Sequence, residues 1–273
     1  MKRQSIAPLL ITGLIALPGL ASAETPAAET VIERAISAAE LESTIAGHDM
    51  IRVAIRQEET TSDGSNSVKE FTAIVHGARL ESIRLELGQG ISLGLNNTIG
   101  WATIQGQVDD RPQTPRMAAG NIRQTLFPLL LPYSLRMEGV QLGMVTVGSF
   151  DGTPAWVVEI TFKPDFFTAP SMLTTWKVFI DREDNLVLGA EFLPPDEFRA
   201  VTDEGIRFRV LKRQNVDGLS LPAHVLLDGI DLNGLENGHV RVTKITAKTV
   251  GPLDLGLFIN PDEAARMDAG DVF

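Results

Sequence analysis

The side chains that most often carry out chemistry in proteins are sparse in this sequence and lie far apart. There is no cysteine, and the four histidines are His48, His76, His224 and His239. They form neither an H-x-x-x-H nor an H-E-x-x-H spacing, so the sequence provides no recognisable zinc site. The G-x-S-x-G turn of serine hydrolases is also missing. These observations favour a protein without catalytic residues, without a bound metal and without a cofactor.

Two further patterns could suggest chemistry but have simpler explanations. Asp181 with Asp184, and Asp196 with Glu197, are pairs of carboxylates, but acids in turns usually bind nearby backbone N–H groups. The glycine-rich segment at residues 88–94 is not followed by the change from strand to helix that a dinucleotide-binding loop requires. A hydrolase would need two carboxylates that face one cleft. It is therefore the weakest of three functional hypotheses.

The N-terminus has the three parts of a secretory signal peptide. Lys2 and Arg3 precede a short apolar run at residues 6–20, and residues 21–23 are Ala-Ser-Ala, small side chains that suit cleavage. We therefore expect cleavage after Ala23 and export of the remaining chain to the periplasm. Because the sequence lacks cysteine, the exported protein is expected to have neither an N-terminal lipid anchor nor disulfide bonds.

The composition favours a soluble domain with a sizeable core. The formal net charge is −11 and basic residues do not cluster, so neither nucleic acid nor an anionic membrane surface is an expected partner. Hydrophobic residues make up 44% of the chain, which is enough for a large core. We expect residues 24–273 to form a single domain, and a monomer is the simplest oligomeric state.

Most of the chain shows the two-residue alternation of half-buried strands. Residues 50–59, for example, alternate apolar and polar side chains. Similar segments, separated by turns such as Asp151-Gly152 and Asp217-Gly218, predict about eleven antiparallel strands. Glycines within these segments indicate bulges and strong curvature. Pro222 cannot donate to a strand ladder, so we expect it at a sheet edge or a bulge.

Two segments depart from this alternation. Residues 30–46 have helical spacing, with Thr30 as the expected N-terminal cap. Residues 118–137 are more apolar than a surface helix needs, and Pro128 predicts a short or broken helix there. The residues between the strands and this segment, 109–117, are expected to form a loop.

The C-terminal half of the chain resembles the LolA/LolB-like proteins, the periplasmic carriers and receptors of outer-membrane lipoproteins. A Trp-bearing strand with an acidic turn is followed later by an Asp-Gly-apolar-x-apolar-Pro pattern, at Trp176, Asp181, Leu186, Asp217, Gly218, Leu219, Leu221 and Pro222. The resemblance extends over residues 140–250, and residues 30–140 agree in the order of helix and strands. Residues 121–135 with the following hairpin also resemble a branch of uncharacterised exported proteins with this barrel.

The resemblance implies a mainly β fold, in which a strongly curved antiparallel sheet forms an unclosed barrel. It also implies an N-terminal helix and places the mid-chain segment as an apolar helical lid or plug. In that family the hollow of the sheet receives acyl chains. A non-catalytic periplasmic carrier for lipid or lipoprotein acyl chains is therefore the first hypothesis. The alternative is a cell-envelope protein–protein interaction module of the same fold, with a plugged barrel.

Candidate ligand-binding residues come from the mid-chain segment and the tryptophans. The apolar cavity or lid would include Trp101, Ile122, Leu126, Phe127, Leu130, Leu131, Trp156 and Trp176. Each of them can also be an ordinary core residue, since acyl-binding walls and cores use the same residue types. Phe166 and Phe167 lie on an expected loop at the mouth of the barrel. They would touch a membrane or a partner if exposed, or else fold back over the core.

Overall fold

The computed structural model describes residues 25–40, 49–61, 63–76, 79–198, 205–252 and 254–268. The expected signal peptide, residues 1–23, lies outside the described residues. The described strands are β1 (Asp49–Thr60), β2 (Asn66–His76), β3 (Arg79–Gly88), β4 (Ile91–Asn96), β5 (Ile99–Ile104), β6 (Gln107–Val108), β7 (Val140–Phe150), β8 (Thr153–Phe162), β9 (Trp176–Asp181), β10 (Val187–Phe192), β11 (Gly205–Val216), β12 (Leu219–Ile230) and β13 (Glu236–Pro252). The described helices are α1 (Ala28–Ala39), α2 (Thr114–Leu126) and α3 (Pro261–Asp268), with short 3-10 helices η1 (Pro128–Leu130), η2 (Tyr133–Arg136), η3 (Pro170–Met172), η4 (Asp196–Phe198) and η5 (Leu255–Leu257).

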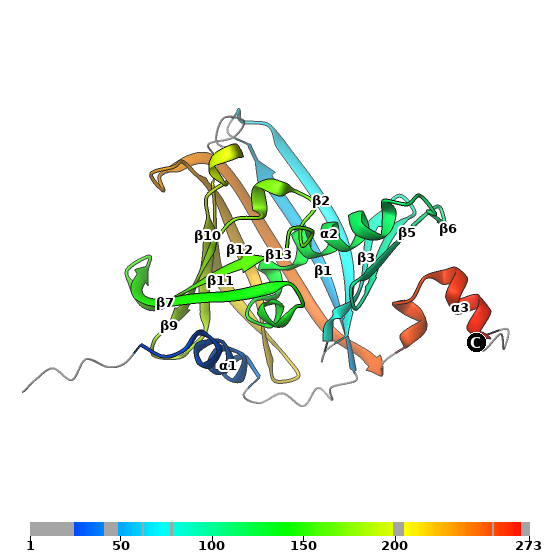
Figure 1. Ribbon diagram of the computed structural model, residues 1–273, viewed down its shortest axis with the longest axis horizontal. Coiled ribbons are helices and arrows are strands. Elements are labelled where there is room, and N and C mark those ends of the chain that lie inside the picture. Colours follow the sequence, from blue (N-terminus) through cyan, green and yellow to red (C-terminus); the bar gives the residue numbers. More distant parts are fainter. Residues whose placement is uncertain are drawn as a thin grey trace, which may run out of the picture.

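The strands form one antiparallel sheet that does not close on itself. Their order is β6-β5-β4-β3-β2-β1-β13-β12-β11-β10-β9-β8-β7, so β6 and β7 are the two edges. In Figure 1 the sheet curves around α2 and the 3-10 helices that follow it, α1 lies below β7, and α3 lies at the outer right. The predicted fold class is confirmed. The described residues contain thirteen strands instead of about eleven, and one of them, β6, is only two residues long.

The mid-chain insertion occupies the inside of the curve. Helix α2 ends at Leu126 and Pro128 begins a 3-10 turn, which confirms the predicted break. The helix begins earlier than expected, at Thr114, so the prediction of a loop through residue 117 is wrong. Pro115 lies in the first turn, where the missing N–H of proline has no helical partner to lose and its fixed φ favours the helix.

Helix α1 covers the end of the interior near β7 and β12. Its buried face consists of Ala28, Val31, Ile32, Ala35, Ile36 and Ala39. The cap prediction is wrong, because Ala27 occupies the N-cap position without a side-chain hydrogen bond and Thr30 lies inside the first turn. The predicted residues 41–46 of this helix lie outside the described residues. Arg136 of η2 donates to Glu33 at 2.7 Å and links α1 to the insertion.

Two predicted features of the hairpins are confirmed. Asp151-Gly152 and Asp217-Gly218 form tight turns in which all four residues have positive φ. Pro222 lies at a bulge, where the register between β11 and β12 shifts around Arg213. The side chain of Gln214 spans this irregularity and binds Pro222 O and Ile245 O.

Candidate functional site

The inner surface of the sheet is apolar at the level of the insertion. On the three neighbouring strands β2, β1 and β13, Ile55 lies opposite Phe71 on one side and opposite Ile245 on the other. Alternate residues of these strands face the interior. Ile55 and Ile245 belong to the main hydrophobic core, and Phe71 packs against it.

The inner surface becomes polar and then charged further along the same strands. Gln57 is the next inward-facing residue of β1 after Ile55, and it lies opposite Lys69 of β2 and Thr243 of β13. After another two residues, Glu59 lies opposite Arg241. Because two residues of a strand span about 6.6 Å, the change from hydrocarbon to charge takes place over roughly 13 Å. The concave face therefore has an apolar end and a charged end.

A hollow of about 620 Å³ lies where these two ends meet, between the sheet and the junction of α2 with η1. Its apolar lining comes from both halves of the sheet and from η1, and consists chiefly of Phe71, Leu129, Phe192, Ile206, Phe208 and Leu227. Its polar lining includes Lys69, His239 and Arg241. The volume lies within the range of ~300–1,000 Å³ typical of small-molecule sites. The combination suits a ligand with one apolar and one polar part.

Glu59 organises the charged end of the hollow. Its Oε1 accepts hydrogen bonds from Arg241 Nε at 3.0 Å and from His239 Nε2 at 2.9 Å. Lys69 Nζ lies 3.8 Å from the other carboxylate oxygen. Burial alone raises the pKa of Glu59, but the hydrogen bonds from Arg241 and His239 outweigh burial and lower this pKa to about 2. The carboxylate therefore stays ionised and holds both neighbouring side chains in place.

These charged residues were not among the candidates from the sequence, although a signal for them exists. The inward positions of β1 are Ile51, Val53, Ile55, Gln57 and Glu59. Every second residue thus continues to face inward beyond Ile55, although the inward side chains are then polar. The inward positions of β13 change in the same direction, from Ile245 through Thr243 and Arg241 to His239. Finding them requires the pairing of β1 with β13, which joins residues almost two hundred positions apart.

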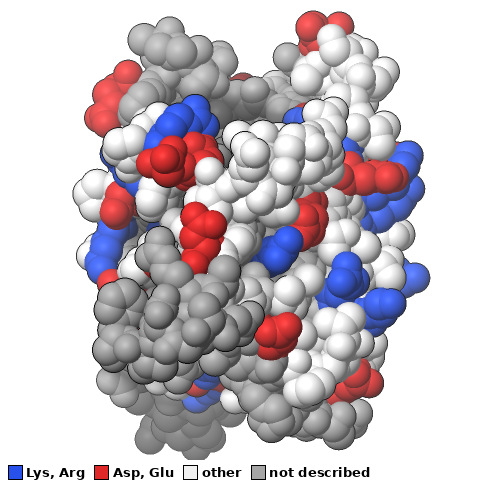
Figure 2. All heavy atoms as spheres, turned by 90° about the vertical axis from the view of Figure 1, so that its right-hand side faces the viewer, with Lys and Arg blue, Asp and Glu red and all other residues white. Residues whose placement is uncertain are grey.

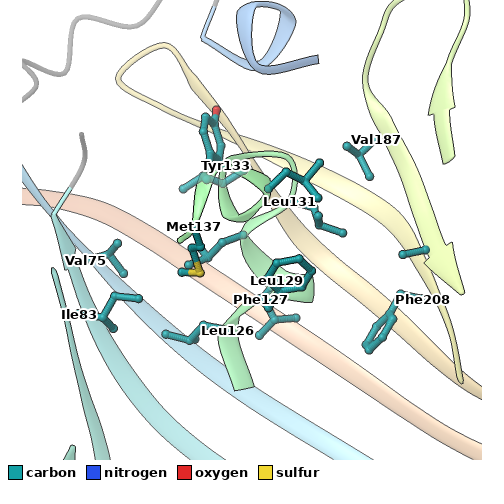
Figure 3. Close-up of a cluster of buried hydrophobic side chains, with 14 of the residues drawn as sticks. Val75, Ile83, Leu126, Phe127, Leu129, Leu131, Tyr133, Met137, Val187 and Phe208 are labelled. Carbon is teal, nitrogen blue, oxygen red and sulfur yellow. The ribbon is translucent and has the colours of Figure 1, made fainter. Parts of the chain in front are cut away.

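The insertion fills the deep part of the interior with its own side chains. The candidate residues that lie there with at most 5% exposure are Ile122, Leu126, Phe127, Leu130 and Leu131. Figure 3 shows Leu126, Phe127 and Leu131 packed between side chains from opposite walls, among them Ile83 and Phe208. None of these five lines the 620 Å³ hollow, and Leu130 instead borders a separate void of about 20 Å³. The insertion is therefore a plug over this part of the barrel.

Trp176 lies directly behind the wall of the hollow. It is fully buried, its indole Nε1 donates to Met172 O at 3.0 Å, and its ring stacks on Phe192 with centroids 4.4 Å apart. Phe208 stacks on it as well, at 5.9 Å. Since Phe192 and Phe208 both line the hollow, Trp176 is separated from it by one layer of rings.

Phe166 and Phe167 fold back over the core. They lie on the predicted loop, but they are only 1% and 2% exposed, so the alternative of an exposed aromatic tip is wrong. Both rings meet Phe127 edge to face, with centroids 5.6 and 5.8 Å apart. Edge-to-face contacts and the burial of two large rings favour this packing over exposure.

Trp101 lies on the opposite face of the sheet from the hollow, which corrects the expectation that it reaches the interior. Its ring lies across Gly94, where an added Cβ would be 1.9 Å from a ring atom. Its indole Nε1 donates to Phe258 O at 2.8 Å, and Phe258 packs with Met50 and Ile74 on this outer face. Trp101 therefore anchors the C-terminal segment.

Trp156 is half-buried on the inner side of β8, against the edge of the core. The Arg182 guanidinium lies 4.7 Å from its ring centroid. Trp156 does not line the hollow.

Three carboxylates converge on Arg209, away from the hollow. Arg209 pairs with Asp228 at 3.1 Å, with Asp151 at 3.4 Å and with Glu236. Burial raises the pKa of Asp228 although Arg209 opposes this. Because Phe208 and Leu227 face inward, their neighbours Arg209 and Asp228 face outward. This arrangement joins neighbouring strands on the outer surface.

On the face shown in Figure 2, acidic and basic side chains are interspersed. In the described part of the chain, no group of three or more His, Cys, Asp or Glu side chains is placed to hold a metal ion. None of the helices within the described ranges is long and apolar enough to cross a membrane.

A curved, unclosed antiparallel sheet around an internal helical insertion is the architecture of the LolA-like half-barrel. The chain is similar in structure to a LolA superfamily protein from Nitrosomonas europaea, with 15% identity, a TM-score of 0.56, and coverage of 87% of this chain and 99% of that one. A DUF1329 family protein from Desulfovibrio piger gives 10% identity, a TM-score of 0.57, and coverage of 87% and 99%. A candidate outer membrane lipoprotein-sorting protein domain from Vibrio parahaemolyticus gives 13% identity, a TM-score of 0.55, and coverage of 88% and 100%.

These likenesses establish that the chain has the LolA-like fold, as the sequence resemblance implied. No protein-family model and no curated protein sequence matches the chain.

Proposed function

We propose that the protein is a non-catalytic periplasmic carrier that binds the apolar part of a lipid or lipoprotein in the 620 Å³ hollow. The observation that carries this proposal is the hollow itself, which has an apolar floor and a charged rim at the open end of a LolA-like sheet. Export to the periplasm is part of the proposal and rests on the signal-peptide features of residues 1–23.

Burial of hydrocarbon supplies the driving force for such a ligand. Each methylene group removed from water contributes about 0.8 kcal/mol, so a chain of ten contributes roughly 8 kcal/mol before the costs of ordering it. The wall contains three aromatic side chains, Phe71, Phe192 and Phe208, which give a large apolar contact area. The hollow is thus suited to one acyl chain, with the insertion as its floor.

The plugged interaction module remains the second candidate function. The packed insertion favours it, because Ile122, Leu126, Phe127 and Leu131 are at most 1% exposed and the void that Leu130 borders is only about 20 Å³. In that case the hollow would be an ordinary surface depression. The two candidates differ in whether the protein retains a lipid when it is purified.

The experiment is native mass spectrometry of the protein purified from the periplasm, followed by organic extraction of bound species. The carrier proposal expects near-stoichiometric acyl-chain species in the wild type. Ile206→Trp fills the hollow from the half-buried inner side of β11, so this variant is expected to lose the ligand. Leu211→Trp is the matched control, since Leu211 lies on the same strand, is 58% exposed and does not line the hollow.

A wild-type protein without any bound acyl species would contradict the carrier proposal and favour the interaction module. Equal loss of ligand in both variants would show that the tryptophan acts through general destabilisation. Retention of ligand in Ile206→Trp would place the binding site elsewhere. Crosslinking in cells would then identify the envelope partner that the second candidate requires.

A further inference from the structure

We propose that the ligand is an amphiphile with an anionic head group, which Lys69 and Arg241 bind at the rim while the chain enters the hollow. This inference rests on the proposed carrier function and adds the chemical class of the ligand. It follows from the balance of charge, the unused donors and the direction of the polarity gradient at the inner surface.

The inward-facing side chains that the structure describes at the rim carry an excess of positive charge. Glu59 is the one carboxylate among the described inward residues of this cluster, and it faces Arg241, Lys69 and His239. Even with a neutral histidine, two cations surround one anion. A chain with a formal net charge of −11 therefore presents a locally basic site, which would attract an anion against the field of the whole molecule.

The neighbouring acids are neutralised on the other face of the sheet. Glu58 and Glu70 alternate with the inward residues, and both pair with Arg56. Lys244 lies 3.6 Å from Glu58 on the same outer side. Glu70 borders the hollow, but its charge is already compensated by Arg56. These acids therefore leave the positive excess at the rim in place.

The basic side chains retain donors that a ligand can use. Arg241 binds Glu59 through Nε and Nη2, which leaves the Nη1 hydrogens of its guanidinium. The Lys69 ammonium is too far from Glu59 for a hydrogen bond, at 3.8 Å, and its side chain is 64% exposed. Together they can donate to the oxygens of a carboxylate or a phosphate, which are strong acceptors for such groups.

The gradient along β13 gives the orientation of the ligand. From Arg241 to Ile245 the strand advances four residues, about 13 Å, and the inward surface changes from charged to apolar. Phe208 and Leu129 form the apolar lining beyond the rim. A straight-chain ligand with its head at Arg241 would thus place its methylene groups against these side chains.

The test compares laurate, dodecanol and dodecyltrimethylammonium, which share one alkyl chain and differ in the charge of the head. Titration calorimetry with the delipidated full-length mature protein is expected to give tightest binding for laurate, about tenfold tighter than for dodecanol, and weakest binding for the cation. Dodecyl phosphate tests the second source of an anionic head, and binding comparable to that of laurate would support a site for either anion. Weak binding of the phosphate would restrict the proposal to carboxylates.

Three variants test the named residues. Lys69→Gln is expected to weaken laurate binding several-fold without affecting dodecanol, and its exposed position makes misfolding a poor explanation. Arg241→Gln combined with Glu59→Gln is expected to weaken laurate binding without leaving a buried carboxylate unpaired. Lys244 lies on the outward face of β13, the strand that carries Arg241. Lys244→Gln therefore serves as the control and is expected to leave laurate affinity unchanged.

The outcomes separate this inference from the proposed function. If laurate and dodecanol bind equally and Lys69→Gln changes neither, the head-group inference is wrong and the apolar carrier stands. If none of the compounds binds, the carrier proposal fails and the inference fails with it. If Lys244→Gln weakens laurate binding as much as Lys69→Gln, the effect is long-range electrostatics and the assignment of a rim site is overturned.

Discussion

Gln214 joins three strands through its side-chain amide, and its removal provides the sharpest test of the sheet topology. Its Nε2 donates to Pro222 O at 2.9 Å and to Ile245 O at 3.1 Å. Its Oε1 accepts from Ala247 N at 3.1 Å. Backbone pairing between β12 and β13 begins only at His224, so the amide replaces ladder bonds in the gap beside the proline. Gln214→Met keeps the length of the side chain but removes all three bonds.

The expected loss of stability follows from the three backbone groups left without a partner. Each unsatisfied buried group costs about 1–3 kcal/mol, and the half-buried position of Gln214 points to the lower end of this range. The total is about 3 kcal/mol. For a protein of this size, each kcal/mol lowers the Tm by about 2–4 °C, which gives an expected decrease of about 6–12 °C.

Urea denaturation followed by circular dichroism measures this free energy. Gln141→Met is the matched control, since Gln141 is exposed on the edge strand β7 and makes a single bond, from Thr161 Oγ1 at 3.3 Å. Its effect is expected to remain within about 0.5 kcal/mol. A Gln214→Met protein as stable as this control would refute the role of the amide as a bridge between β11, β12 and β13.

Two further predictions concern the charged rim and the outer face. Because the pKa of Glu59 is lowered from 4.5 to about 2 in the folded state, its ionised form stabilises the protein above pH 4.5, and this stabilisation is lost as the pH falls toward 2. Between pH 7 and pH 3 the wild type should therefore lose on the order of 2 kcal/mol more unfolding free energy than Glu59→Gln does. Urea titrations should show a smaller difference in stability between the two proteins at pH 3 than at pH 7. Gly94→Ala places a methyl group against Trp101 and is expected to cost about 1–3 kcal/mol, with a red shift of tryptophan emission as the C-terminal segment loosens. Unchanged emission and stability in Gly94→Ala would contradict the position of Trp101 on the outer face.

Local patterns were sufficient to predict most elements of this fold. The alternation in residues 50–59 predicts β1, and the two Asp-Gly pairs predict two tight hairpins of the sheet. Both signals depend only on residues that are neighbours in the chain. Pro128 predicts the end of α2 for the same reason. Thr30 failed as a cap because the packing of α1 against the sheet, and not its terminal hydrogen bond, sets where the helix begins.

The candidate site depends on which face of each strand is the inner one, and alternation alone cannot decide this. Trp101 was expected inside because it is large and apolar, but the outer face of this part of the sheet is also buried, under Phe258. Conversely, Arg241 and Glu59 have the residue types of an exposed surface and lie on the inner face. Contacts between distant parts of the chain decide both outcomes: the pairing of β1 with β13 brings Arg241 beside Glu59, and the C-terminal segment at Phe258 covers Trp101.

The open sheet leaves β7 as a strand whose described partner in the ladder is β8 alone. Its eleven residues include no charged side chain and no proline, and Met144 and Val147 are 67% and 57% exposed. Natural edge strands usually carry lysine or proline that prevents them from pairing with another chain. The negative charge of the molecule supplies a different protection, since copies repel one another at low ionic strength. Salt screens that repulsion, so concentrated solutions of this protein are expected to associate more readily as the ionic strength rises.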